Sequence, residues 1–268
     1  MNGFTQFFYN LAHGLADKVY GGNVLEDAKN ILTGTSIDAA TNVMQSGYNI
    51  IVSVSAVLIT LYFLLDLIEE MQRPHSQTPE TIFKTLVKVV IAVELVIHGF
   101  DLFVTLRQVG DALTGSLVGI MSVSGGGASV ADQIVPQGEK WYTYLGIWIE
   151  LTLPFICSKI ISVGINVTCY ARLIELSIRT IFAPIAITNV FHDGLRSPGV
   201  RYIKKYIAVC LQSAVIICIL ALASLISLSA IQGNPGDDNF VWATLAINFS
   251  ALIAILKSQS VANDIAGA

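Results

Sequence analysis

Three ionisable side chains recur at helical spacing inside an apolar stretch of the sequence: Glu94, His98 and Asp101 occupy positions i, i+4 and i+7. Residues at this spacing share one face of a helix. An imidazole between two carboxylates could pass protons along a hydrated path, with His98 as the group that exchanges them. The same groups could instead form a static polar seam that holds helices together, and both interpretations fit the pattern.

A second charged cluster, Arg172, Glu175 and Arg179, occupies positions i, i+3 and i+7, and Pro184 follows it. Glu175 can neutralise one arginine, which leaves one positive charge for a lipid headgroup, a neighbouring subunit or a carboxylate elsewhere. Alternatively, the long side chains anchor a helix at a membrane interface by snorkelling. The sequence thus predicts either an assembly contact or an interfacial anchor.

Basic residues are concentrated in the short segment from Phe191 to Lys205, which contains Arg196, Arg201 and Lys204 in addition to Lys205 itself. Near a membrane surface each basic residue is attracted to anionic lipid headgroups by about 1 kcal/mol. Short loops rich in Lys and Arg also stay in the cytoplasm. We therefore expect this loop to be cytoplasmic and to contact lipid headgroups or a cytoplasmic partner.

Sequence patterns typical of enzymes and metal sites are absent. There is no GxxxxGK[ST] loop, HExxH pair or GxSxG elbow, the four histidines are scattered, and the four cysteines form no CxxC pair. We therefore predict no enzyme activity, no catalytic residue, no cofactor and no metal site, and allow for a bound phospholipid.

These polar groups must be positioned by membrane-spanning helices. The chain is 54% hydrophobic and 13% charged, against about 25% charged residues in an average soluble domain. Apolar runs of about 18 or more residues can cross a bilayer as helices. The predicted spans cover residues 48–68, 82–106, 141–170 with an extension to 191, 206–231 and 240–256. The expected fold is thus an all-α, polytopic membrane protein with about five crossings, preceded by residues 1–47 and followed by a short tail, 258–268.

The third span is expected to be extra-long or broken. The stretch from Trp141 to Phe191 is about 50 residues long, although about 20 suffice to cross a bilayer. Crossing once, it places the N-terminus outside and the C-terminus inside. Splitting the stretch into two crossings gives six spans with both ends inside. That alternative moves the loop around Arg73 outside, which the distribution of basic residues disfavours.

Residues 1–47 begin with an apolar stripe at helical spacing. Its members are Phe4, Phe7, Phe8, Leu11 and Leu15. The stripe predicts an amphipathic helix that lies in the outer membrane interface or packs on its own protein. Both interpretations remain open at this point.

The segment from Arg172 to Gln212 resembles the TrbL-type conjugal transfer proteins, which are polytopic channel components of type IV secretion systems. The variant it is most similar to occurs in mobile elements of Gram-positive bacteria. The features that carry the resemblance are the Arg-x-x-Glu-x-x-x-Arg spacing, the Ala183-Pro184-Ile185-Ala186 step, the Gly-x-x-Ser-x-Gly-x-Arg-Tyr loop and the Lys204-Lys205 pair. The order of spans extends the similarity more loosely over residues 48–257.

The resemblance implies five spans with an outside N-terminus, as the charge distribution also predicts. It further implies a homo-oligomer, a pentamer, in the bacterial plasma membrane beneath or within a DNA- and protein-export channel, without catalysis or cofactor. The chain is shorter than many relatives and has a brief tail after its last span.

We therefore expect a membrane channel or scaffold subunit of a conjugative type IV secretion system that oligomerises around the export path. Its expected partners are membrane lipid, copies of itself, other secretion subunits including cytoplasmic ATPases, and the translocated DNA or protein. Under this hypothesis the 172–184 cluster acts in assembly or coupling, and the basic loop contacts headgroups or an ATPase. The alternative is a small proton-coupled secondary transporter or ion channel built around the second span, although the inverted repeats usual in transporters are not found.

Overall fold

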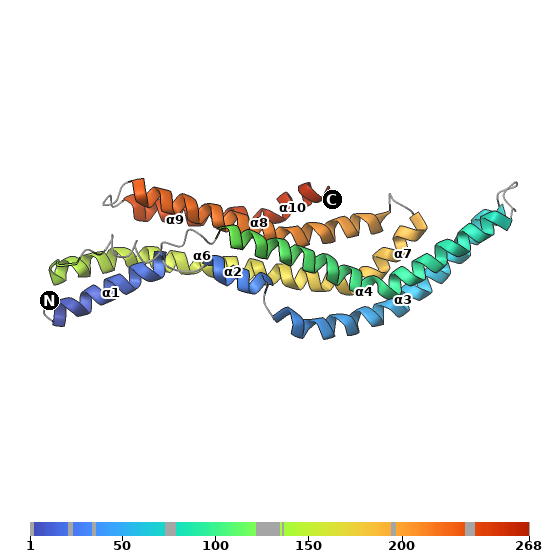
Figure 1. Ribbon diagram of the computed structural model, residues 1–268, viewed down its shortest axis with the longest axis horizontal. Coiled ribbons are helices and arrows are strands. Elements are labelled where there is room, and N and C mark those ends of the chain that lie inside the picture. Colours follow the sequence, from blue (N-terminus) through green and yellow to red (C-terminus); the bar gives the residue numbers. More distant parts are fainter. Residues whose placement is uncertain are drawn as a thin grey trace. The chain divides into compact units, whose positions relative to one another are not determined.

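The computed structural model describes residues 3–20, 24–33, 36–72, 79–121, 135, 137–193, 197–233 and 239–267. Within these residues the regular structure is helical, with no strand (Figure 1). The helices are α1 (Gly3–Tyr20), α2 (Val24–Thr33), α3 (Ser36–Gln72), α4 (Pro79–Met121), α6 (Trp141–Ile181), α7 (Ala183–Asp193), α8 (Pro198–Gly233), α9 (Asn239–Leu256) and α10 (Ser258–Ala266).

Several of these helices are long and apolar enough to cross a membrane. Among the described residues, four helices contain a candidate membrane span; the spans are Thr41–Glu69, Thr85–Gly119, Trp141–Ile181 and Pro198–Ser227. The pair Trp242–Leu256 and Ser258–Ala266, bent by 45°, makes a fifth if it is counted as one span. In the most apolar part of Thr41–Glu69 only 11% of the residues are buried, so most of that apolar surface requires lipid or another protein. The chain is therefore an all-α, polytopic membrane protein, as predicted.

The third span is extra-long, also as predicted. α6 runs without interruption from Trp141 to Ile181, and its 41 residues at about 1.5 Å each are about twice as long as the ~30 Å hydrocarbon core. The helix ends just before Pro184, whose ring nitrogen carries no hydrogen to continue the backbone ladder. α7 starts at Ala183. One continuous helix in this stretch agrees with a single crossing.

The other helices extend beyond the predicted spans. α3 begins at Ser36 rather than at residue 48, and α4 ends at Met121 rather than at residue 106. The second predicted span ends at residue 106, directly before Arg107. The structure keeps this side chain largely buried inside the helix bundle, so the helix continues past it.

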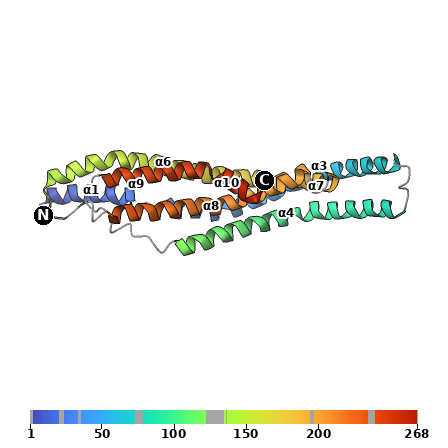
Figure 2. The ribbon, with the colours of Figure 1, turned by 90° about the horizontal axis from the view of Figure 1, so that it is seen from above.

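The chain divides into two compact units, and α4, α6 and α8 contribute residues to both. The first unit comprises Met1–Leu32, Leu113–Tyr170 and Ala214–Ser258. In it, α1 runs beside the beginning of α6 (Figures 1 and 2), where Ala12 and Ala16 pack with Tyr144 and Leu151. A second core in this unit contains Val118, Ile161, Ile165, Cys169, Ile216, Ile217, Leu220 and Ile255.

The apolar stripe of α1 is divided between two environments. Phe8 and Leu15 pack against the core shared with α6, whereas the side chains of Phe4 and Phe7 are 61% and 60% exposed. The Phe4 ring meets the exposed Trp141 ring edge to face, with 5.7 Å between centroids. The helix therefore packs on its own protein with one side and presents aromatic rings with the other.

The second unit comprises Thr33–Ala112, Ala171–Ser213 and Gln259–Ala268. Its core is built from α3, α4, α7 and the adjoining parts of α6 and α8. The Tyr48 hydroxyl of α3 donates a hydrogen bond to the Val96 carbonyl of α4 at 2.7 Å. Close packing at this contact requires Gly99, because a Cβ there would lie 2.5 Å from the Tyr48 hydroxyl and 2.8 Å from Ile187 Cδ1.

The start of α8 is fixed by local signals. The Ser197 hydroxyl accepts a hydrogen bond from the Val200 amide at 3.2 Å, which is N-cap geometry, and Pro198 occupies the first helical position. At Gly199 a Cβ would overlap the Ala186 carbonyl oxygen of α7. This glycine therefore lets the first turn of α8 lie directly against α7.

Candidate functional site

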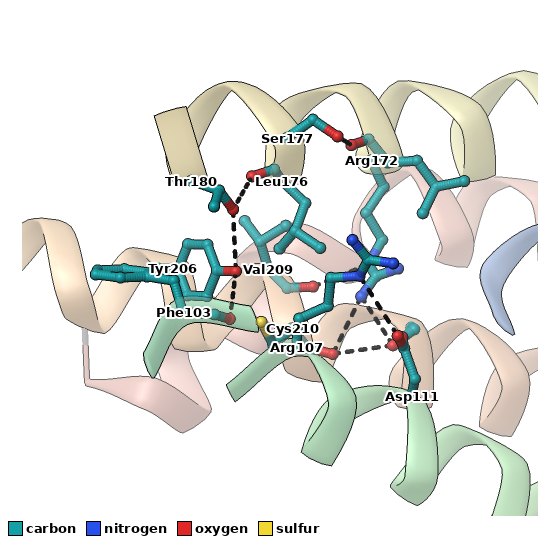
Figure 3. A network of polar contacts seen from close by, with 12 residues as sticks. Phe103, Arg107, Asp111, Arg172, Leu176, Ser177, Thr180, Tyr206, Val209 and Cys210 are labelled. Carbon is teal, nitrogen blue, oxygen red and sulfur yellow. Dashed lines mark hydrogen bonds and ion pairs between the residues drawn. The ribbon is translucent and has the colours of Figure 1, made fainter. Parts of the chain in front are cut away.

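A buried arginine joins two spanning helices in the second unit. Arg172 of α6 is 2% exposed. Its Nε donates to the Val209 carbonyl of α8 at 2.8 Å, and its Nη2 donates to the Cys210 carbonyl at 3.2 Å and to Ser213 Oγ at 2.9 Å (Figure 3). A carbonyl oxygen has two lone pairs and can accept such a bond in addition to its helical one. The backbone of α8 thus helps to compensate a buried positive charge.

An ion pair on α4 belongs to the same network. Arg107 Nε lies 3.5 Å from Asp111 Oδ2, and the side chains are 13% and 22% exposed. The Asp111 carboxylate is attracted by both Arg107 and Arg172. Between the two α4 residues, Gly110 abuts α8, because a Cβ there would lie 2.9 Å from the Cys210 carbonyl oxygen. α4 and α8 therefore approach closely at the arginine network.

A tyrosine hydroxyl completes the connection among α4, α6 and α8. Tyr206 of α8 donates to the Phe103 carbonyl of α4 at 2.9 Å and lies 3.2 Å from Thr180 Oγ1 of α6. The Phe103 and Tyr206 rings also meet edge to face, with 4.6 Å between centroids. Polar side chains thus connect three long helices, and they supply one another with the hydrogen bonds that lipid could not provide (Figure 3). We call this set of contacting residues the polar junction; its members are Phe103, Arg107, Asp111, Arg172, Thr180, Tyr206, Val209, Cys210 and Ser213.

The structure separates the predicted 172–179 cluster. Arg172 enters the polar junction, whereas Arg179 pairs with Glu175 through Nε at 2.9 Å and Nη2 at 2.6 Å. The side chains of this pair are 21% and 32% exposed. Gln259 of α10 lies 3.4 Å from Glu175 Oε1, and the Tyr202 hydroxyl of α8 donates to the Arg179 carbonyl at 2.6 Å. The pair therefore sits where α6, α8 and α10 meet.

The described members of the basic loop lie on the first turns of α8. Arg201, Lys204 and Lys205 are exposed there, and Lys204 Nζ donates to the Gly267 carbonyl after α10 at 3.2 Å. A cation at the C-terminal end of a helix is favourable because the last carbonyls carry partial negative charge. Arg196 lies outside the described residues.

A third polar cluster connects α3, α4 and α7 and was not predicted. Asp66 pairs with Lys88 Nζ at 3.2 Å and with His192 Nδ1 at 3.1 Å. The His192 ring stacks on Tyr62 with 4.3 Å between centroids, and the Tyr62 hydroxyl donates to Asn189 at 3.0 Å. These contacts attach the helix that follows the break in α6 to the α3–α4 pair.

The predicted Glu94–His98–Asp101 arrangement lies on the exposed side of α4. Glu94 Oε2 and His98 Nε2 are 3.5 Å apart, with side chains 65% and 72% exposed. Asp101 is also exposed. The three residues thus share a face, and that face points away from the core of their own unit.

Among the described residues no group of three or more His, Cys, Asp or Glu side chains is placed to hold a metal ion. Sequence reasoning also missed Arg107, Asp111, Asp66 and His192. The i, i+4 spacing of Arg107 and Asp111 was a usable signal, but the pair fell just past the predicted end of its span. The contact between Asp66 and His192 joins residues 126 positions apart, and no local pattern indicates it.

The fold and these intramembrane polar sites define a multi-pass, α-helical membrane protein. Residues 38–184, more than half of the chain, match the family model described as TrbL/VirB6 plasmid conjugal transfer like protein. The chain belongs to this family. The match confirms the predicted family, although the segment on which the resemblance was based, 172–212, overlaps it over residues 172–184 alone.

The family assignment makes the chain a component of conjugal transfer or type IV secretion, and this family is not known as an enzyme family. Neither the curated proteins nor the solved structures contain a significant match.

Proposed function

We propose that this chain is a channel or scaffold subunit of a conjugative type IV secretion system in the bacterial plasma membrane. Copies of it would oligomerise around the path of exported DNA or protein. The observation that carries the proposal is the family match. The exposure of Glu94, His98 and Asp101 near the middle of the span Thr85–Gly119 supports it. An ionisable group at the bilayer centre costs about 2.5–3.5 kcal/mol, so contact with protein or water is favoured over lipid.

The Glu175–Arg179 pair and the start of α8 form the proposed coupling surface. The pair is partly exposed, and Arg201 and Lys205 are exposed on the adjoining helix. The positive-inside rule places this end of α8 in the cytoplasm. There the basic side chains would contact anionic headgroups or a cytoplasmic ATPase of the secretion system.

The proposal is tested in a donor cell that carries the mobile element. Deleting the gene should abolish transfer, and the complementing, tagged protein should be purified in detergent as particles of several copies with ring symmetry, a pentamer by family resemblance. Secretion ATPases should co-purify with it. Monomeric particles or undiminished transfer would overturn the proposal.

A proton-coupled transporter or ion channel is the second candidate, and the exposed Glu94–His98 pair favours it. Under this alternative, deletion would leave DNA transfer intact. Proteoliposomes containing the purified protein would then move protons or solute in a manner that depends on His98.

A further inference from the structure

The predicted arrangement on α4 is part of a longer polar stripe. After Glu94, His98 and Asp101, the positions i+11 and i+14 are Thr105 and Gln108, and all five residues are exposed. At about 1.5 Å per residue the stripe rises about 21 Å, or two-thirds of a ~30 Å hydrocarbon core. A continuous polar stripe therefore follows α4 through most of the membrane.

The stripe lies on the side of α4 opposite its packed face. Val96 and Phe103, which are 2% and 1% exposed, belong to the core of the second unit. Apolar side chains border the stripe on both sides, among them Ile97, 53% exposed, and Leu102, 44% exposed. The exposed surface of α4 thus has a polar centre and apolar margins.

α3 carries a matching stripe. Asn42, Ser46, Asn49 and Ser53 occupy positions i, i+4, i+7 and i+11, the spacing that begins the α4 stripe, and all four are exposed. The packed side of α3 again lies opposite, at residues such as Tyr48, which is 1% exposed.

The two stripes lie at the same level of the antiparallel α3–α4 pair. Tyr48, in the middle of the α3 stripe, bonds to Val96 and packs on Phe100 with 5.5 Å between ring centroids. Both partners fall within the range of the α4 stripe, 94–108. One section of the membrane therefore contains neutral polar groups on α3 and, on α4, two carboxylates among other polar groups.

We infer that the α4 stripe of one copy and the α3 stripe of the next line a water-filled, cation-accepting passage between copies of this chain. The inference rests on the proposed oligomer and specifies which helix faces meet between neighbouring copies. The two stripes point away from each other within one copy, and in a ring each copy meets the next through the same two faces. A dry contact would bury the Glu94 and Asp101 carboxylates against neutral Asn and Ser side chains, which is costly. Water hydrates them, and acidic side chains that line a pore are typical of cation pathways.

The exposed surface of α6 provides a contrast. Glu150 and Lys159 are exposed there, but isolated among apolar side chains such as Leu153, Ile156 and Ile160, which are 53%, 50% and 64% exposed. This pattern fits lipid, with the charged groups snorkelling toward an interface. Positions on α6 are therefore matched controls.

The first test measures water access. Single cysteines are placed in the full chain, with Cys157, Cys169, Cys210 and Cys218 replaced, after showing that this background still supports transfer. Substitutions at the stripes are Asn49→Cys, Asp101→Cys, Thr105→Cys and Gln108→Cys. Controls at exposed apolar positions are Ile97→Cys, Leu102→Cys and Ile160→Cys.

A membrane-impermeant, cationic thiol reagent should modify the stripe cysteines in intact vesicles and leave the controls unmodified. Stripe cysteines that stay unreactive in an oligomeric particle overturn the water-filled passage while leaving the proposed oligomer intact. A monomeric particle overturns both. The oligomeric state of each variant, measured in the same detergent, separates the two failures.

The second test measures ion selectivity. Proteoliposomes containing the purified chain are given a KCl gradient, and the reversal potential is recorded. The wild type should prefer K⁺ over Cl⁻, and the double variant Glu94→Gln/Asp101→Asn should lose that preference, whereas Glu150→Gln should retain it. Conductance without cation preference, or equal behaviour of the two variants, would contradict the inference.

Discussion

Arg172 Nε on α6 lies 2.8 Å from the backbone carbonyl oxygen of Val209 on α8, so a guanidinium links two spanning helices through main-chain atoms. The adjoining Cys210 carbonyl and the Ser213 hydroxyl accept bonds from Nη2. A side chain that bonds to backbone carbonyls depends on the position of the partner helix rather than on one particular partner side chain. The contact therefore fixes the position of α8 along the axis of α6.

Replacing Arg172 with alanine should destabilise the second unit. The change removes charge-assisted hydrogen bonds between α6 and α8, and we expect a loss of about 2–3 kcal/mol. Arg172→Lys should give an intermediate loss, because an ammonium cannot reproduce the fork of the guanidinium. Thermal unfolding in detergent can be followed by the reaction of the buried thiols of Cys169 and Cys210, neither of which is in a disulfide, with a dye.

Ile174→Ala is the matched control on the same helix, because Ile174 is 61% exposed. Its melting temperature should stay close to that of the wild type. If Arg172→Ala melted like this control, the polar junction would contribute nothing to stability.

Gly110→Ala should separate α4 from α8. The added Cβ would lie 2.9 Å from the Cys210 carbonyl oxygen and 3.2 Å from its Cβ, and a backbone oxygen cannot turn aside as a side chain can. Gly115→Ala introduces the same methyl group on the same helix with nothing within 4 Å. Alanine is favoured over glycine in a helix by about 1 kcal/mol, so Gly115→Ala should be neutral or stabilising. Equal melting temperatures for the two variants would show that the close approach is unimportant.

The spans could be predicted because uncharged apolar runs mark them directly. Their ends were less predictable, since a charge was taken to lie outside the membrane. Arg107 shows why this fails: with Asp111 one turn away and α8 against it, the side chain is 13% exposed. A sequence displays the charge of such a residue but not the partner that compensates it.

The candidate sites show the same limit. Helical spacing places Glu175 and Arg179 one turn apart on α6, and their local ion pair follows from it. It did not predict that Arg172 bonds to the carbonyls of Val209 and Cys210, because every residue has a carbonyl and no pattern singles out the acceptors. To predict that the α4 stripe is exposed, one must also know which face of α4 packs on the neighbouring helices.

Asp66→Asn should loosen α7 from the α3–α4 pair. Asp66 contacts both Lys88 and His192, and asparagine keeps the size of the side chain while removing its charge. Because Lys88 is 41% exposed, solvent screening limits the expected loss from the Lys88 contact to about 0.5–1 kcal/mol. Hydrogen exchange of the α7 amides should become faster in this variant.

A double-mutant cycle with Lys88→Met tests whether the two residues act together. The two effects should add to more than the effect of the double variant, because both remove one shared contact. Thr60→Ala serves as the control on α3, since that hydroxyl bonds to the carbonyl of Ala56 in its own helix. Unchanged exchange in Asp66→Asn would mean that the contacts of Asp66 do not hold α7.

Arg179→Ala should reduce conjugal transfer without removing the protein from the membrane. An i, i+4 ion pair that is partly exposed contributes about 0.3–0.5 kcal/mol, too little for its loss to unfold a bundle of long helices. Transfer frequency per donor cell is therefore measured alongside the amount of membrane-inserted protein.

The double exchange Glu175→Arg/Arg179→Glu keeps an ion pair but reverses its direction. If the ion pair only stabilises α6 locally, the exchange restores transfer. If Arg179 presents its charge to a partner, as we expect, transfer stays low, and wild-type transfer in Arg179→Ala would remove this residue from the coupling surface.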